Sequence, residues 1–407
     1  MVKVIVSRVT PSVYLLRLND FDTVYFEGLW RIREGITYNA YVVVGPEGAI
    51  VIDGWKRGYG ELFVESLRRV VDLKDVKLVV FHHTEPDHSG SLPQLIKELD
   101  NTTVLAHPIA KGILEAFYGL NLKFKSVSDG ETVKSEGLSL KFFYTPWLHW
   151  PDTIVSYLEE EGVFFTCDVF GSYGVPSSVF YEDLPEDEKS LFVRHITKYF
   201  ANVIGSYRQW VIKNLVKIEE LVKKAKVIAP GHGPLYRDHN FPLSLYTKLG
   251  SEIPSRGKAL VLYFSMYGFS QELAELITEK LKSKGLSVAL WGATSYRRDD
   301  ESEIVADAYD SEYLILVAPI YETKAFPLAS YLLELILSKI PTSGRKVLVI
   351  STYGWASGAG KKLVGMLIEK GFTSVELVEV RGLTKEQRRA VEQALDKLIE
   401  KGVGTGI

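Results

Sequence analysis

The sequence predicts an α/β protein with two domains, and three observations support this. Its 407 residues are 46% hydrophobic and 24% charged, a composition typical of a globular protein large enough for more than one core. Residues 1–250 mix short strand-like segments with amphipathic helices, whereas residues 258–407 alternate strand and helix regularly. Residues 251–257 are polar and contain Pro254 and Gly257, so we expect a linker there.

The first domain, residues 1–250, is expected to be a sandwich of sheets and helices. Amphipathic helices are predicted over 59–71 and 92–99. Apolar runs rich in strand-forming residues predict strands over 76–81, 138–143, 162–166 and 226–229.

Histidines or carboxylates follow each of these four strands. They are His83, Glu85, Asp87, His88, His149, Asp168 and His232. Because their local settings are so alike, we expect one cluster at one rim of a sheet, with enough ligands for two metal ions. The alternative is a set of independent polar strand ends. The other four histidines, His82, His107, His195 and His239, are interpreted as structural or solvated.

The first of these segments carries four of the candidate ligands within six residues. In an extended turn alternate side chains point the same way, so His83, Glu85 and Asp87 are expected to converge while His88 points to the other side. Asp168 has two carboxylate oxygens and is a candidate to bridge two ions.

Three large aromatic residues flank the candidate ligands in the sequence. Trp147, Trp150 and Phe170 are candidates for a wall that excludes water, and plain hydrophobic core is the other interpretation.

The second domain, residues 258–407, contains five successive strand–helix units. The strands are predicted over 259–264, 287–291, 313–318, 346–351 and 374–380, and the helices over 270–284, 301–308, 327–338, 359–370 and 385–401. This pattern predicts a doubly wound, five-stranded parallel sheet, whose ligand site lies at the carboxyl ends of its strands.

Three loops at those strand ends form a candidate binding site. Their residues are Ser265, Met266, Tyr267, Gly268, Phe269 and Ser270; Pro319, Ile320 and Tyr321; and Ser351, Thr352, Tyr353, Gly354 and Trp355. The first loop offers hydroxyls and a helix N-terminus to a phosphate, and the other two offer aromatic groups to a flat ring. The first loop lacks Lys and Arg, and the P-loop motif is absent, which favours a phosphate bound through hydrogen bonds.

The first-domain motifs resemble those of the flavodiiron proteins, also called A-type flavoproteins. They are His83-Thr-Glu-Pro-Asp-His-Ser-Gly90, Trp147-Leu-His-Trp-Pro-Asp152, Thr166-Cys-Asp168 and Pro230-Gly-His-Gly233. The resemblance implies a metallo-β-lactamase-like αββα sandwich followed by a flavodoxin-like FMN-binding domain, in the order observed here. Zinc hydrolases of this fold carry His-x-His-x-Asp-His, whereas this chain has Glu85 at the second histidine. A carboxylate there favours iron over zinc.

By the family pattern, the site holds two iron ions in a bridged non-haem centre. His83, Glu85, His149 and Asp168 would bind one iron, and Asp87, His88, Asp168 and His232 the other. The pattern departs at Arg33 and Glu34, a region where many members carry a histidine near the iron site.

The resemblance implies an oxidoreductase that reduces O2 to water, NO to N2O, or both. FMN passes on the electrons, and a rubredoxin-type protein or a reduced soluble cofactor supplies them. It also implies a head-to-tail homodimer or homotetramer in which the FMN of one subunit lies beside the irons of another. Two alternatives are a dinuclear zinc hydrolase with an accessory flavin domain, and an FMN electron carrier with a vestigial metal domain.

Composition argues against several other classes of function. The net charge is −3 and basic stripes are absent, so nucleic acid is not an expected partner. Apolar runs of 18 residues are also absent, so we expect no membrane span and a cytoplasmic protein. The one cysteine, Cys167, excludes an internal disulfide and a cysteine-ligated iron–sulfur centre.

Overall fold

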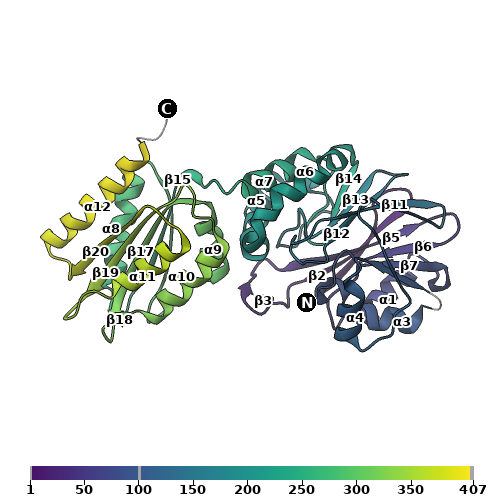
Figure 1. The fold of residues 1–407 in the computed structure, drawn as a ribbon, viewed down its shortest axis with the longest axis horizontal. Coiled ribbons are helices and arrows are strands. Elements are labelled where there is room, and N and C mark those ends of the chain that lie inside the picture. The colour runs from purple at the N-terminus through teal and green to yellow at the C-terminus, as the bar shows by residue number, and fades with distance from the viewer. Residues whose placement is uncertain (1, 100–101, 404–407) are drawn as a thin grey trace. The chain divides into compact units, whose positions relative to one another are not determined.

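The computed structural model describes residues 2–99 and 102–403 and divides the chain into two compact units, Met1–Ser251 and Glu252–Ile407 (Figure 1). Strand β15 (Ser255–Phe264) begins inside the expected linker, four residues before the predicted start. Ser255 continues this strand because it pairs with Ser311 and hydrogen-bonds through its hydroxyl to Asp310.

The first unit is built on two sheets that share one apolar core. The larger sheet has seven strands in the order β1 (Lys3–Arg8), β2 (Val13–Asp20), β5 (Ile36–Val44), β6 (Ala49–Ile52), β7 (Val76–Val80), β8 (Thr103–Ala106) and β9 (Phe124–Ser126). The smaller has five, in the order β10 (Thr132–Ser135), β11 (Leu138–Tyr144), β12 (Ile154–Leu158), β13 (Val163–Cys167) and β14 (Val227–Pro230). Leu15 and Ile52 of the larger sheet join Phe142 and Phe165 of the smaller in this core. A short hairpin pairs β3 (Tyr25–Phe26) with β4 (Trp30–Arg31).

Helices cover the outer faces of both sheets, as Figure 1 shows. Beside the larger sheet lie α1 (Gly60–Arg68), α3 (Leu92–Glu98) and α4 (Ala110–Tyr118), and beside the smaller lie α5 (Glu186–Tyr199), α6 (Arg208–Lys224) and α7 (Asn240–Gly250). Shorter elements are the helical turns η1 (Leu73–Asp75), η2 (Tyr181–Asp183) and η4 (Gly205–Tyr207), the helix α2 (Pro86–Ser89) and the π-helical turn η3 (Phe200–Ile204). The αββα sandwich is thus confirmed.

The second unit is the predicted five-stranded parallel sheet. Its order is β16 (Ser287–Ala293), β15, β17 (Ser311–Tyr321), β19 (Lys346–Tyr353) and β20 (Val375–Arg381), and β18 (Lys324–Ala325) adds a short antiparallel pair to β17. Its helices are α8 (Phe269–Ser283), α9 (Glu301–Asp310), α10 (Pro327–Lys339), α11 (Gly360–Lys370) and α12 (Lys385–Val403). Numbered along the domain, the strand order is 2-1-3-4-5, the doubly wound order of flavodoxins.

Both faces of this sheet are covered, which explains why β15 is apolar without alternation. Val261 and Tyr263 pack toward α8 and α12, whereas Leu260 and Leu262 lie on the other face with residues of α10. Within the described ranges, every helix is too short or too polar to span a membrane.

One buried cation ties the larger sheet to the loop that follows β14. Arg17 of β2 is 1% exposed and donates to Asn39 Oδ1 (2.9 Å) and to the carbonyls of Ser178 (3.2 Å) and Gly233 (3.0 Å). Burial lowers its pKa to about 10, since a charge is costly away from water. These bonds hold the backbone at Gly233 and Ser178 against β2.

Replacing Arg17 with methionine should lower the free energy of unfolding by about 3 kcal/mol, because several buried carbonyls lose a charged donor. Urea denaturation followed by tryptophan fluorescence measures this, since five of the seven tryptophans lie in the first unit. The exposed Arg8, changed to methionine, serves as control and should cost less than about 0.5 kcal/mol. Equal losses in the two variants would contradict this account of Arg17.

Candidate functional site

The seven candidate metal ligands converge in the first unit. Ligand atoms of His83, Glu85, His149 and Asp168 all lie within 4.8 Å of one another, and so do those of Asp87, His88 and His232. Two adjacent groups therefore form, each of a size that suits one metal ion.

The cluster lies where both sheets end, which corrects the expectation of a single rim. His83 follows β7 of the larger sheet, whereas His149, Asp168 and His232 follow β11, β13 and β14 of the smaller one. The sequence marks strand ends but not the sheet to which each strand belongs. The shared core brings the two sets of ends together.

The predicted alternation within the first segment is also wrong at Asp87, which joins His88 rather than His83 and Glu85. The reason is local. Pro86 begins helix α2, so the backbone leaves the extended conformation and side chains no longer alternate after Glu85. The first group has the four residues expected for one metal ion, and the second has Asp87, His88 and His232 of the four expected for the other.

Asp168 lies between the two groups and offers one oxygen to each. Its Oδ2 is 3.4 Å from His83 Nε2 and 3.3 Å from His149 Nε2. Its Oδ1 is 3.1 Å from His88 Nε2 and 3.3 Å from His232 Nε2. This is the geometry of a carboxylate able to bridge two cations.

The donor atoms fit metal ions because several of them are buried without a hydrogen-bond partner. Both oxygens of Asp87, Oδ2 of Asp168 and Nε2 of His232 are in this state. Leaving such groups unsatisfied costs free energy, and a cation removes that cost. Four imidazoles and three carboxylates form a mixed nitrogen and oxygen set that suits iron.

Without metal, the carboxylates hold protons on the neighbouring histidines. Burial alone lowers the pKa of His149, but Glu85 and Asp168 outweigh it and raise that pKa to about 10. Burial likewise opposes ionisation of Glu85, yet His149 and His83 hold its pKa well below its usual range. The site therefore attracts positive charge, whether protons or metal ions.

The backbone around the ligands is closely fitted. A Cβ on Gly231 would lie 2.6 Å from Cε1 of His88, so only glycine leaves room for that ring. The next residue, His232, donates from Nδ1 to the carbonyl of Thr37 at 2.7 Å. An outer partner of this kind fixes the ring orientation of a metal-binding histidine.

Aromatic rings enclose the cluster. The Trp150 ring lies 5.9 Å from that of His83, which agrees with the wall expected at this position, whereas Phe170 packs on Tyr246 in the core and Trp147 stacks on Tyr207. Sequence reasoning missed three rings that lie against His232, because they are distant in sequence from every ligand. They are Phe26 (6.0 Å), Tyr38 (5.6 Å) and Tyr199 (5.6 Å).

Glu34, in the segment where many flavodiiron proteins carry a histidine, forms a largely buried ion pair. Its carboxylate lies 2.8 Å from Nζ of Lys198, and the two side chains are 13% and 2% exposed. Lys198 also lies over the ring of Tyr173.

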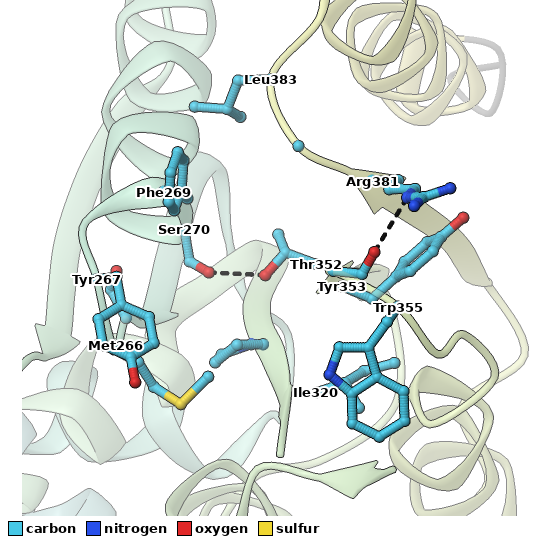
Figure 2. Close-up of a pocket in the computed structure, with 14 residues that line it drawn as sticks. Met266, Tyr267, Phe269, Ser270, Ile320, Thr352, Tyr353, Trp355, Arg381 and Leu383 are labelled. Atoms are coloured by element: carbon cyan, nitrogen blue, oxygen red, sulfur yellow. Dashed lines mark hydrogen bonds between the residues drawn. The ribbon is translucent and has the colours of Figure 1, made fainter. Parts of the chain in front are cut away.

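The second unit has a cavity of about 490 Å³ at the carboxyl ends of its strands (Figure 2). All the predicted loop residues line it except Gly268, Tyr321 and Ser351. Ser351 is enclosed within β19, Tyr321 packs edge-on against Phe326, and Gly268 starts α8 in a left-handed conformation at φ +93°.

Three lining residues were missed: Arg381, Gly382 and Leu383, at the end of β20. The sequence does indicate that β20 ends at this edge of the sheet. The loop after β20 was not selected because it lacks the aromatic residues that marked the other loops. Arg381 Nε donates to the carbonyl of Gly354 at 3.0 Å, which is one of the dashed lines in Figure 2. It is the one charged residue that lines the cavity among the described residues.

The loop before α8 has features that favour the binding of an anion. Gly268 starts the helix without a side-chain cap, which leaves N–H groups of the first turn available. Ser270 joins Thr352 across the cavity through their hydroxyls, 2.8 Å apart (Figure 2). Tyr267 and Trp355 are 83% and 79% exposed, so aromatic surface flanks an open pocket.

Comparisons with known proteins cover both units of the chain. Residues 36–233 match the ODP family beta lactamase model and residues 261–396 match the flavodoxin model, which implies a flavin. The chain is 30% identical over 381 residues to the coenzyme F420H2 oxidase of Methanothermobacter marburgensis, covering 91% of this chain and 92% of that protein. It is 27% identical to the nitric oxide reductase of Moorella thermoacetica, with 87% and 88% covered.

Among solved structures, a mutant of the flavo di-iron protein of Thermotoga maritima is similar over nearly the whole chain. It is 35% identical, with a TM-score of 0.90, and the match covers 98% of this chain and 99% of that one.

Uptake of ferrous ions by the metal-free protein should release protons at pH 7–9, because His149 is protonated below its pKa of about 10 and must lose that proton to bind. For each proton displaced, the apparent affinity should rise about tenfold per pH unit across this window. Anaerobic calorimetry in buffers of different ionisation enthalpy counts the protons. Heats that do not depend on the buffer would contradict the protonated site.

Proposed function

Because this chain belongs to the flavodiiron oxidoreductase family, we propose that it reduces O2 to water, NO to N2O, or both, at a diiron site supplied with electrons by FMN. The observation that carries the proposal is Asp168, whose two oxygens face two separate groups of ligands. The relatives named nitric oxide reductase and coenzyme F420H2 oxidase support this reaction class.

We assign one iron to His83, Glu85, His149 and Asp168, and the other to Asp87, His88, His232 and Asp168. When bound, two ferrous ions supply one electron each and reduced FMN supplies two, which matches the four electrons that convert O2 to two waters. The protein orients the ligands through outer partners such as Thr37 and limits water through the rings around His83 and His232.

For FMN, we assign the phosphate to the Ser265–Ser270 loop and the ring to the loops after β17 and β19. The uncapped start of α8 supports the first assignment, and the rings of Tyr353 and Trp355, which both line the cavity, support the second. Arg381, at the edge of the same pocket, complements the negative charge of FMN and its reduced form.

We further propose a head-to-tail homodimer or a tetramer of such dimers, with FMN of one subunit beside the irons of the partner, and a rubredoxin-type protein or a reduced soluble cofactor as electron donor. The two sites lie in separate units of the chain, so electrons must pass between units, and the family pattern provides this passage between subunits. A monomer that turns over at full rate would overturn this arrangement.

A dinuclear zinc hydrolase is the second candidate, because the αββα sandwich also serves that chemistry. Glu85 argues against it, since a carboxylate replaces the second histidine of the hydrolase motif. Metal analysis of protein produced with both metals available separates the two. Stoichiometric zinc without flavin would refute the redox proposal, whereas anaerobic assays of the chemically reduced protein with each gas separate O2 from NO.

Replacing Asp168 with alanine should abolish O2 or NO consumption while FMN stays bound, because the bridging carboxylate is lost and the flavin pocket lies in the other unit. Gas consumption and the FMN to protein ratio measure the two effects. The exposed Asp187, changed to alanine, is the control and should keep full activity. Gas consumption that persists in Asp168→Ala would contradict a metal-centred reaction.

Replacing Ser270 with alanine should weaken FMN binding about tenfold, because a hydroxyl that lines the cavity is lost. Riboflavin, which lacks the phosphate, should bind the variant and the wild type alike. Quenching of flavin fluorescence measures both affinities. Ser283→Ala, at the far end of α8, controls for effects on the helix. If the variant binds FMN and riboflavin more weakly by the same factor, the assignment of the phosphate to this loop is contradicted.

A further inference from the structure

Cys167 lies directly behind one of the assigned iron ligands. Its sulfur is 3.0 Å from Nδ1 of His83, and both side chains are buried. The other ring nitrogen, Nε2, points toward Glu85 (3.3 Å) and Asp168 (3.4 Å). The His83 ring is thus held between the ligand cluster and a thiol.

This arrangement determines where the proton of His83 lies. A histidine that binds a metal through Nε2 is neutral and carries its proton on Nδ1, which must then find an acceptor. For His83 that acceptor is Cys167 Sγ. For His232 it is the carbonyl of Thr37, which is an ordinary partner for a metal-binding histidine.

The position of the sulfur is itself fixed. Cys167 is the last residue of β13 and adopts φ +50°, and its carbonyl accepts the N–H of Gly231 at 2.6 Å. The sulfur also lies within 4.8 Å of ligand atoms of Asp53 and His82, and within the same distance of ligand atoms of His88 and Asp168. These constraints leave the thiol little freedom to turn away from His83.

We propose that Cys167 is a positioning residue of the metal centre. Its thiol accepts the Nδ1 proton of His83, fixes the tautomer and rotation of that ring, and so strengthens binding of the iron in the His83 group. Its backbone also positions the next residue, Asp168. Cys167 therefore determines the positions of two ligands, His83 and Asp168. The inference rests on the proposed function, since it requires iron in this group.

The sulfur also distinguishes His83 from His232. A thiol is a weaker acceptor than a carbonyl oxygen, so His83 is a less basic ligand than His232.

The test compares Cys167→Val, which is apolar and somewhat larger and removes the acceptor, with Cys167→Ser, which keeps an acceptor at this position. Iron-loaded, full-length protein is mixed anaerobically with a ferrous chelator, and release of each iron is timed. Cys167→Val should release one iron on the order of 10–100-fold faster and leave the other unchanged. It should also raise the midpoint potential of one iron. Cys167→Ser should return both readings to near the wild-type values.

The control is Ser156→Ala, which removes a buried hydroxyl 2.9 Å from His82 Nε2 without touching an assigned ligand, and its release rates should match the wild type. If Cys167→Val does not fold, Cys167→Ala replaces it, because alanine is smaller and avoids a β-branched side chain at φ +50°.

Each other outcome is decisive. Wild-type protein that retains no iron overturns the proposed function and this inference with it. Iron-loaded wild type and Cys167→Val with equal release rates overturn the inference alone. Equal acceleration in Cys167→Val and Cys167→Ser also overturns it, because packing rather than the hydrogen bond would then be the cause.

Discussion

The concentration of negative charge around Asp168 is the constraint on which the rest of the first unit depends. Three largely buried carboxylates lie together, and the basic side chains that the described residues pair with them are histidines rather than Lys or Arg. Such an arrangement is costly in a medium of low dielectric constant unless cations are present. Protonated histidines meet this need in the metal-free protein, and two divalent ions would meet it in the proposed diiron form. The ligands meet only when the ends of both sheets lie together, whether protons or metal ions balance the charge. Folding and metal binding are therefore coupled.

Much of this could be predicted from sequence, for definite reasons. The carboxyl ends of strands are a general place for ligands, so His83, His149, Asp168 and His232 were identifiable from the apolar runs before them. The parallel sheet of the second unit followed from its regular period. The grouping of ligands did not follow, because it depends on the helical turn that Pro86 starts and on which strands share a sheet. The turn at Pro86 is local, whereas the sheet to which each strand belongs is set by tertiary packing.

The same limit explains the remaining misses. Arg381 reaches the flavin pocket because β20 ends beside β19, a neighbour relation that the order of elements suggests but single residues do not mark. Phe26, Tyr38 and Tyr199 enclose His232 from three distant segments. The pair Glu34 and Lys198 joins residues 164 positions apart. In each case the sequence shows the chemical type of the residue but not which residues lie next to it in space.

The burial of the chain's one cysteine has a practical consequence. Because Cys167 is 1% exposed, a thiol-specific alkylating reagent reaches it only when the end of β13 opens. The rate at which this single sulfur is labelled therefore measures how often the metal site opens. An engineered probe is not needed. If loading with a given ion slows the labelling, the ratio of the two labelling rates gives the free energy by which that ion stabilises the closed arrangement of the two sheets.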